Sequence, residues 1–461
     1  MLNVLALLLY CTLVPNVWAS ICNLRKYPDG YVCVCNVTHC DDMKIDEPVN
    51  FGDYILVTSS KAGERFDVTK GSFLQPTVFR IKRQTNKIDI ESPINSITLS
   101  INRDKKYQSI VGFGGALTGT VSHLLDLMPN KLREILYLIG AAWSAPRWMK
   151  TNNDWSGRGF LKKEFYQTWA DYHLQYLRLM GKNGLKYWAI STGNEPLNGR
   201  WWWWVVHFMS LGWTADEQGK WVGEHLGPTL NQSEYANVKL FAGDDQRYTF
   251  PWWFQRMTIG SDKAMDFVSG LAVHWYWDQF ISPYPLELAH SKYPDKIILN
   301  TESSVGDKPW ERHGPILGSW ERGEQYALHM LQDFEHYVGG WIDWNLILDE
   351  NGGPSYINNT VDAAIILNST THHEFYRQPI FYAIAHFSKF IPSGSVRIES
   401  MLNGFRSGQI KAVAFLRPDE KITIILYNKS DKTKTVSFTD DIRGSFQLEL
   451  KPRSINSFLF A

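Results

Sequence analysis

The chain has 461 residues, of which 44% are hydrophobic and 14% aromatic, so it can bury one large core with a smaller module beside it. Its 47 basic and 47 acidic residues give a formal net charge of zero. This balance excludes a broad electrostatic surface for nucleic acid or anionic membrane, and we expect no nucleic-acid partner.

The first 19 residues predict a signal peptide. The opening MLNVLALLLYCTLVPNVWAS is apolar and ends in a Val17-x-Ala19 pattern, which is typical of a cleavage site. A membrane anchor is the alternative, but it needs about 20 apolar residues without helix breakers. Because Pro15 and Asn16 interrupt the stretch, we expect cleavage after Ala19 and entry into the secretory pathway.

Segment 20–46 holds four of the five cysteines, close behind the predicted signal. They are Cys22, Cys33, Cys35 and Cys40. In a secreted chain this crowding predicts two disulfides, and a zinc site is the alternative. Five sequons fit the same route and predict N-glycosylation. Their asparagines are Asn36, Asn231, Asn358, Asn368 and Asn428.

Both ends of the chain carry the alternating pattern of β-strands. Residues 47–103 and 396–461 contain short apolar-polar alternations broken by turn residues, as in RPDEK and TDDIRG. We expect the two segments to pair into one β-sandwich.

Residues 104–395 repeat a different theme, in which a short apolar run is followed by a helix-like stretch. Such repeats predict a parallel sheet covered by helices, and the polar and aromatic residues at the run ends favour a TIM (β/α)8-type barrel with its chemistry at the C-terminal rim. The runs are 107–115, 137–146, 185–196, 238–247, 270–277, 296–303 and 340–348.

One βα unit of the predicted barrel is missing. Seven runs are present and an intact barrel has eight strands. The shortage falls in residues 114–140, which leave room for one helix between the first and second runs. Loss of an interior strand exposes backbone groups at roughly 1–3 kcal/mol for each buried unsatisfied group, so we expect poorer folding or weaker activity.

Two acidic residues close apolar runs that lie about three βα units apart. Glu195 ends the run 185–196 and Glu302 ends 296–303, so both should stand at the rim. Glycoside hydrolysis needs this arrangement, one protonated acid and one ionised carboxylate. The alternative for Glu195 is a helix N-terminal acid. Trp143, Trp275 and Trp344 on neighbouring rims favour the catalytic interpretation, because indole faces suit sugar rings.

Several motifs together resemble glycoside hydrolase family 30, and within it the animal glucosylceramidases. The motifs are GNEP with Glu195, LNTESSVG with Glu302, VHWY at 273–276, WSAPRWMKTN, DWNL, HFSKFIPSGS and CVCN. The similarity runs from about Ser20 to the C-terminus, and the combination of motifs is highly specific.

The resemblance implies a retaining hydrolase that cleaves glucosylceramide into glucose and ceramide. Glu195 would be the acid/base and Glu302 the nucleophile. The implied substrate-binding residues are Trp143, Asn194, His274, Tyr276, Trp344 and Asn359. The resemblance also implies the disulfides Cys22 to Cys33 and Cys35 to Cys40, a lysosomal location, a glycolipid substrate at a membrane surface and a saposin-type activator protein.

No cofactor or metal is expected. The chain has no Gly-rich phosphate loop after a strand, and the adjacent His372 and His373 have no specified carboxylate partner.

The chain also departs from the family pattern. The missing block carries an arginine near the nucleophile and an aspartate that binds glucose, and Gly119 stands where the family has aspartate. Two alternatives therefore stay open: another β-glycanase of the clan, such as a xylanase or β-1,6-glucanase, and an inactive secreted glycolipid-binding protein. Trp201–Trp204, directly beyond Glu195, are either a rim loop that meets ceramide or membrane, or a loop packed on its own barrel.

Overall fold

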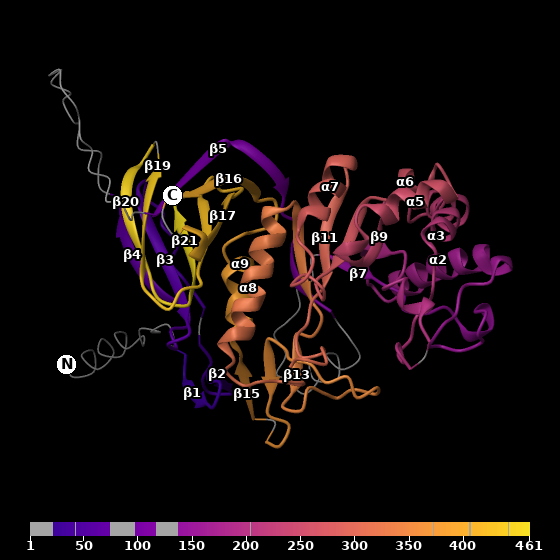
Figure 1. The fold of residues 1–461 in the computed structure, drawn as a ribbon, viewed down its shortest axis with the longest axis horizontal. Helices are drawn as coiled ribbons and strands as arrows, with labels where there is room; N and C mark the ends of the chain where they lie inside the picture. The colour runs from indigo at the N-terminus through magenta and orange to yellow at the C-terminus, as the bar shows by residue number, and fades with distance from the viewer. Residues whose placement is uncertain are drawn as a thin grey trace, which may run out of the picture.

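The computed structural model describes residues 22–41, 43–73, 97–116, 137–202, 204–371, 373–404, 407–440 and 442–461. The predicted signal peptide, Gly119, Trp203 and His372 lie outside these residues. The described chain forms three sheets with helices between and around them (Figure 1). None of its helices has the length and apolar character that crossing a membrane requires.

A parallel seven-stranded sheet forms the barrel, in the order β6-β12-β11-β10-β9-β8-β7. Six of the strands lie inside a predicted run and β12 begins two residues before its run, because uninterrupted apolar residues suit a strand that is covered on both faces. The strands are β6 (Gly112–Gly115), β7 (Leu138–Gly140), β8 (Tyr187–Ser191), β9 (Lys239–Gln246), β10 (Gly270–His274), β11 (Ile297–Glu302) and β12 (Val338–Asp343).

The sheet is open between β6 and β7. Strand β6 pairs with β12 and β7 pairs with β8, and no strand of the described chain pairs with the other edge of either. This seam is the place where the sequence predicted a missing unit. The connecting residues 117–136 lie outside the described part of the chain.

Helices cover the outer face of the barrel and separate it from the second domain. They are α2 (Tyr166–Lys182), α3 (Ala215–Trp221), α4 (Gly227–Asn231), α5 (Trp252–Gly260), α6 (Ala264–Phe267), α7 (Tyr284–Lys292), α8 (Trp320–Glu335) and α9 (Pro379–Ser388). Helices α8 and α9 lie between the barrel and the second sheet, where Phe334, Phe387 and Phe415 share one core cluster (Figure 1).

The second sheet has nine strands and combines both chain ends, as predicted. Strand β5 pairs with β16 and β3 pairs with β21. The ring centroids of Tyr54 on β3 and Phe446 on β20 are 4.5 Å apart although these strands lie far apart in the sheet order, so the sheet folds over itself as a sandwich. The strands are β3 (Asp53–Ser60), β4 (Asp67–Ser72), β5 (Ile97–Ser109), β16 (Val396–Asn403), β17 (Ile410–Leu416), β18 (Ile422–Asn428), β19 (Lys434–Asp440), β20 (Gly444–Leu450) and β21 (Ser454–Phe460).

A third sheet was not predicted, because its strands are short and come from distant parts of the sequence. N-terminal strand β2 pairs antiparallel with β15, so segment 20–46 is built into the catalytic domain. The order is β1-β2-β15-β14-β13. The strands are β1 (Leu24–Tyr27), β2 (Gly30–Asn36), β13 (Ile347–Asp349), β14 (Ile365–Leu367) and β15 (Glu374–Arg377).

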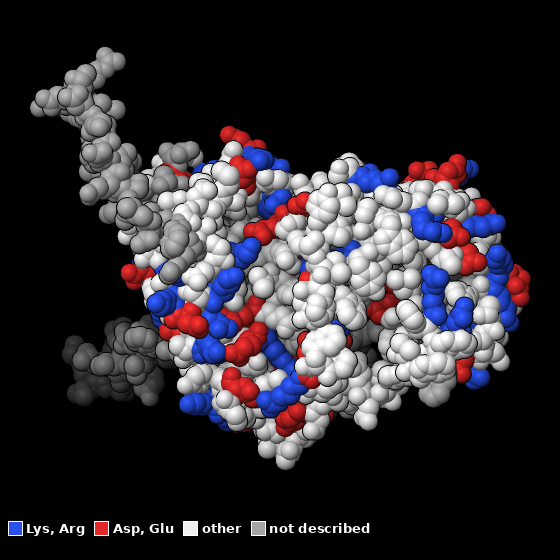
Figure 2. All heavy atoms as spheres, viewed as in Figure 1, with Lys and Arg blue, Asp and Glu red and all other residues white. Residues whose placement is uncertain are grey.

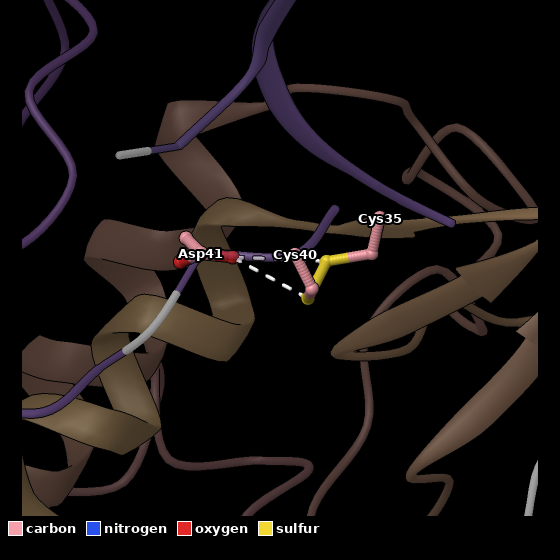
Figure 3. Close-up of side chains that lie close together, drawn as sticks. All are labelled: Cys35, Cys40 and Asp41. Carbon is pink, nitrogen blue, oxygen red and sulfur yellow. Dashed lines mark hydrogen bonds between the residues drawn. A yellow bond between two sulfur atoms is a disulfide. The ribbon is translucent and has the colours of Figure 1, made fainter. Parts of the chain in front are cut away.

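The four cysteines form the two disulfides that the resemblance implied, Cys22 to Cys33 and Cys35 to Cys40. This pairing leaves none of these sulfurs as a thiolate and so rules out the zinc alternative. Asp41 lies beside the second disulfide (Figure 3). Its carboxylate accepts hydrogen bonds from Arg377 and Tyr382, which ties the segment to β15 and α9.

The surface shows acidic and basic side chains interspersed over the face in Figure 2, in keeping with the zero net charge. Among the sequons, Asn231 and Asn358 are exposed, and Asn36 and Asn368 are half-buried. Asn428 is fully buried, and its Nδ2 donates to the carbonyls of Lys432, Leu450 and Lys451. The fold therefore corrects the glycosylation prediction for Asn428, since a glycan on this nitrogen is incompatible with these contacts.

Candidate active site

The ends of β8 and β11 bring Glu195 and Glu302 together. Glu302 is the last residue of β11, and Glu195 follows the end of β8 by four residues. One carboxylate oxygen of each, with a ring nitrogen of His274 on β10, all lie within 4.8 Å of one another. The two acids therefore face the same small volume at the barrel rim, as the sequence predicted.

Tight backbone geometry holds Glu195 in place. Its φ of 39° lies in the left-handed region, which costs a non-glycine residue free energy unless the surroundings enforce it. Its N–H donates to the carbonyl of Asp244 at 2.8 Å, and the N–H of Asn194 donates to the carbonyl of Ala142 at 3.0 Å. These two hydrogen bonds tie Glu195 and its neighbour to strand β9 and to the loop after β7.

Three side chains contact the Glu195 carboxylate. Gln246 Nε2 donates to Oε1 at 2.7 Å, His274 Nδ1 lies 3.0 Å from the same oxygen, and Asn198 Nδ2 donates to Oε2. Nearby Asp245 is fully buried, and burial with the adjacent charge of Glu195 raises its pKa to about 7. Glu195 thus has fixed hydrogen-bond donors and an ionisable neighbour.

Glu302 is the more buried acid, with 8% of its side chain exposed against 13% for Glu195. Burial raises the pKa of Glu302 to about 8, and the charge of Glu195 adds to this effect. The charge of His274 and the hydrogen bond from the Tyr276 hydroxyl, at 2.8 Å, act in the opposite direction. An ionised Glu302 therefore depends on these two neighbours.

Sequence reasoning missed Asp244, Asp245 and Gln246, which all contribute to this site. They close the run 238–247, and the signal that could have found them was the same as for Glu195, polar residues at the end of an apolar run. Asp244 accepts hydrogen bonds from the hydroxyls of Ser191 at 2.6 Å and Thr301 at 2.7 Å.

An aromatic wall stands beside the carboxylates. Trp143 and Trp344 stack with their centroids 5.0 Å apart, and Phe208 contacts Trp143 edge-on at 5.7 Å. The backbone N–H of Trp344 donates to the carbonyl of Ser303, next to Glu302. The expected sugar platforms therefore adjoin the acid pair.

Two predicted positions behave differently. Trp275, expected at the rim, is 3% exposed and packs in the core against Tyr326 and Trp341. Asn359 is an exposed residue in the loop after β13, where its N–H donates to the Ser355 hydroxyl. No hydrogen bond described in the structure links Asn359 to either carboxylate, so its role in glucose binding stays a prediction.

Metal-ligating side chains do meet at this site, because Glu195, His274 and Glu302 form a cluster with suitable spacing. The ring of His274 is already enclosed, since Nδ1 faces Glu195 and Nε2 lies 3.2 Å from Asp244 Oδ1. Each ring nitrogen faces a protein carboxylate, so neither is directed at an open position for a metal ion.

A parallel barrel with two close carboxylates and an aromatic wall at its C-terminal rim, joined to a β-sandwich, defines a glycoside hydrolase. Residues 124–391 match the glycosyl hydrolase family 30 TIM-barrel domain, and residues 394–458 match the family's beta sandwich domain. The chain belongs to glycosyl hydrolase family 30.

Individual relatives agree with this assignment. Lysosomal acid glucosylceramidase of Mus musculus is 30% identical over 506 aligned residues, which cover 93% of each chain. The aligned length exceeds the 461 residues of this chain, so the alignment contains gaps in it.

Solved structures share the fold. SrfJ from Salmonella typhimurium has a TM-score of 0.72 at 21% identity, covering 88% of this chain and 99% of its own. The endo-beta1,6-glucanase BT3312 has a TM-score of 0.71 at 22% identity, covering 89% and 100%.

Proposed function

We propose that this glycoside hydrolase is a retaining β-glucosidase that cleaves glucosylceramide to glucose and ceramide. The observation that carries the retaining mechanism is the approach of the two acids, whose nearest oxygens lie within 4.8 Å. Retaining enzymes hold their carboxyl groups roughly 5 Å apart, whereas inverting enzymes need roughly 6.5–9.5 Å to admit a water molecule. The substrate class rests on the likeness to the mouse glucosylceramidase.

The proposed chemistry assigns one role to each acid. Glu302 attacks the anomeric carbon while Glu195 gives its proton to the leaving ceramide oxygen, and a glucosyl ester forms on Glu302. Glu195, now ionised, then removes a proton from water, whose oxygen attacks the anomeric carbon and releases Glu302 as a carboxylate. The aromatic wall of Trp143 and Trp344 would orient the sugar ring.

A cyclophellitol-type epoxide tests this proposal. We expect a stable ester on Glu302, found by mass spectrometry of its peptide, and no adduct with Glu302→Gln. Glucosylceramide turnover by the labelled enzyme should disappear. A chain that binds glucosylceramide without forming the ester would instead be a binding protein, and a preference for xylan or β-1,6-glucan would place it with the other glycanases of the clan.

We further propose that the substrate is met at a membrane surface, in the lysosome or elsewhere along the secretory pathway. Trp201, Trp202 and Trp204 are 55%, 50% and 62% exposed, although tryptophan is usually well buried. The Arg158 guanidinium lies 5.5 Å from the centre of the Trp202 ring. Tryptophan beside arginine is the composition favoured at a lipid interface.

The loop that carries Trp201, Trp202 and Trp204 is attached to the barrel rim on both sides. The Gly159 N–H donates to the carbonyl of Gly199, and Lys150 Nζ donates to the carbonyl of Ser210 at 2.7 Å. Within the loop, Phe208 contacts Trp143 at the site. A bilayer touching these tryptophans would therefore lie next to the acid pair. We also expect the saposin-type activator protein to act at this lipid surface.

Replacing Trp202 and Trp204 with serine should weaken binding to vesicles of anionic phospholipid and glucosylceramide, while hydrolysis of a soluble aryl β-glucoside continues. Tyr172→Ser is the matched control, because Tyr172 on α2 is 51% exposed and lies away from the rim loops. Equal losses on the vesicle and soluble substrates would argue against a membrane role for the loop.

A further inference from the structure

His274, at the end of β10, is enclosed by carboxylates from the neighbouring strands β9 and β11 and from the loop after β8. Nδ1 lies 3.0 Å from Glu195 Oε1. Nε2 lies 3.2 Å from Asp244 Oδ1 and 4.0 Å from Glu302 Oε2. The side chain is 1% exposed, so water does not screen these charges.

Where Asp244 and Glu195 both accept hydrogen bonds from the ring, His274 needs a proton on each ring nitrogen. Asp244 already accepts hydrogen bonds from Ser191 and Thr301, which keeps its carboxylate ionised and oriented toward the ring. A neutral imidazole donates from one nitrogen only, and its other nitrogen would then direct a lone pair at a carboxylate. An imidazolium satisfies Asp244 and Glu195 together.

We propose that Asp244 holds His274 as a permanent imidazolium, and that this cation is a positioning residue that keeps the ionised member of the Glu195 and Glu302 pair stable through both halves of the reaction. The proposal deepens the proposed function and rests on its two-acid mechanism. Among the described residues, His274 is the basic side chain within 4.0 Å of a Glu302 oxygen.

The position between the two acids explains why one cation suffices. Before attack the negative charge is on Glu302, and after ester formation the proton lost to the leaving oxygen moves the charge to Glu195. The His274 ring faces both carboxylates, so its charge compensates the anion in either state.

The electrostatics of the surrounding groups agree with this assignment. Burial alone would lower the pKa of His274, but Glu302, Asp244 and Glu195 together hold it well above its ordinary value. The pKa of Asp244 is correspondingly lowered by His274 and by its two hydroxyl donors, despite burial. Asp245 and Tyr276 are the other titratable groups beside these residues.

Nitrogen NMR of the full chain labelled with 15N-histidine tests the protonation state without any substrate. We expect one histidine with two protonated ring nitrogens at pH 7.5, absent from His274→Gln and converted to a neutral ring in Asp244→Asn. A neutral tautomer for His274 in the wild-type chain at this pH would overturn the proposal, whether or not the chain hydrolyses glucosylceramide.

The pH profile of kcat/KM on an aryl β-glucoside tests the consequence. His274→Gln keeps a donor for Glu195 but removes the charge, so the Glu302 pKa should rise and the acid limb should move up by about one to three pH units. Thr301→Val is the structural control, which removes one hydrogen bond to Asp244 and should lower the rate without moving the limb. An acid limb that stays in place in His274→Gln would show that the ring acts by shape alone.

Discussion

Two non-glycine residues with positive φ meet at the active site. Glu195 has a φ of 39° and Asp244 a φ of 52°, and the N–H of the first donates to the carbonyl of the second. Such conformations cost roughly 1–3 kcal/mol each and persist where the surrounding structure enforces them. In this site the two strained backbone conformations position the Glu195 and Asp244 carboxylates on either side of the His274 ring.

Tyr276→Phe should impair catalysis by removing the hydroxyl that donates to Glu302. A hydrogen bond to a charged group contributes about 1.5–3 kcal/mol, so kcat/KM should fall roughly 10- to 150-fold. The Tyr276 hydrogen bond lowers the Glu302 pKa, so its loss should also move the acid limb of the profile to higher pH. Steady-state kinetics across pH measures both effects.

Tyr293→Phe is the matched control for this variant. The buried Tyr293 hydroxyl has no hydrogen-bond partner, and its removal should leave both rate and profile unchanged. If Tyr276→Phe behaved like this control, the contact with Glu302 would have no catalytic role.

At the scale of elements, the N-terminal segment is tied to the catalytic domain by strand pairing and by one carboxylate. Strand β2 pairs with β15, and Asp41 joins Arg377 on β15 to Tyr382 on α9. The two disulfides restrict the segment locally. Long-range attachment therefore depends on Asp41 and on the ladder between β2 and β15.

Asp41→Ala should destabilise the folded chain by about 3 kcal/mol, because it leaves the largely buried Arg377 guanidinium without its carboxylate. Urea denaturation followed by tryptophan fluorescence measures the loss. Asp46→Ala is the control, since its ion pair with Lys70 is exposed to solvent and should contribute little. Similar midpoints for the two variants would contradict the anchoring role of Asp41.

At the scale of the whole molecule, the described residues leave an open seam in the barrel sheet between β6 and β7. Across this seam the described chain keeps the stacking of Trp143 after β7 on Trp344 after β12. Unpaired backbone groups at roughly 1–3 kcal/mol each are a large burden for a protein whose net stability is of order 5–15 kcal/mol.

Inserting one βα unit from a family relative at the seam should raise the denaturation midpoint and the turnover of glucosylceramide. The inserted strand would pair with β6 and β7 and satisfy both edges. The denaturation midpoint and the glucosylceramide turnover are measured in parallel on the original chain and on the chain with the insertion. Equal stability and equal turnover would show that the seam carries no cost.

Stability of the whole chain should fall as pH rises from 6.5 to 8. Burial raises the pKa of Asp343 to about 8 and that of Asp333 to about 7. Unfolded carboxyls titrate near pH 4, so between these values the folded chain holds protons that the unfolded chain has lost, and rising pH favours unfolding. The lowered pKa values of buried His173 and His386 oppose this trend only below about pH 6.5.

Asp343→Asn should flatten this fall by about 1–2 kcal/mol, because the amide keeps an acceptor for the Tyr326 hydroxyl and does not titrate. Thermal unfolding of the wild-type chain and of Asp343→Asn at pH 6.5 and 8 measures this loss of stability. Tyr326→Phe removes the same hydrogen bond but keeps the acid, so the fall should remain. A wild-type melting temperature that is constant over this range would refute the linkage.

The sequence alone determined the seven barrel strands, the sandwich made from both chain ends, the seam and the two acids. These features follow from local apolar periodicity and from residues at the ends of runs, which are properties of short stretches. Tertiary structure alone decided which polar side chains meet. His274 and Asp244 are 30 positions apart, and only the pairing of β10 with β9 makes them neighbours.

Burial was likewise decided by the fold. Asn428 carries a good sequon, yet sheet pairing of β18 removes it from solvent, and Trp275 follows a rim strand but packs in the core. Strands β13, β14 and β15 are too short to be recognised by pattern, and they pair with one another and, through β15, with β2. The residue pattern of a short stretch indicates which secondary structure that stretch prefers. The contacts, burial and charge environment of its side chains depend on which other parts of the chain pack beside it.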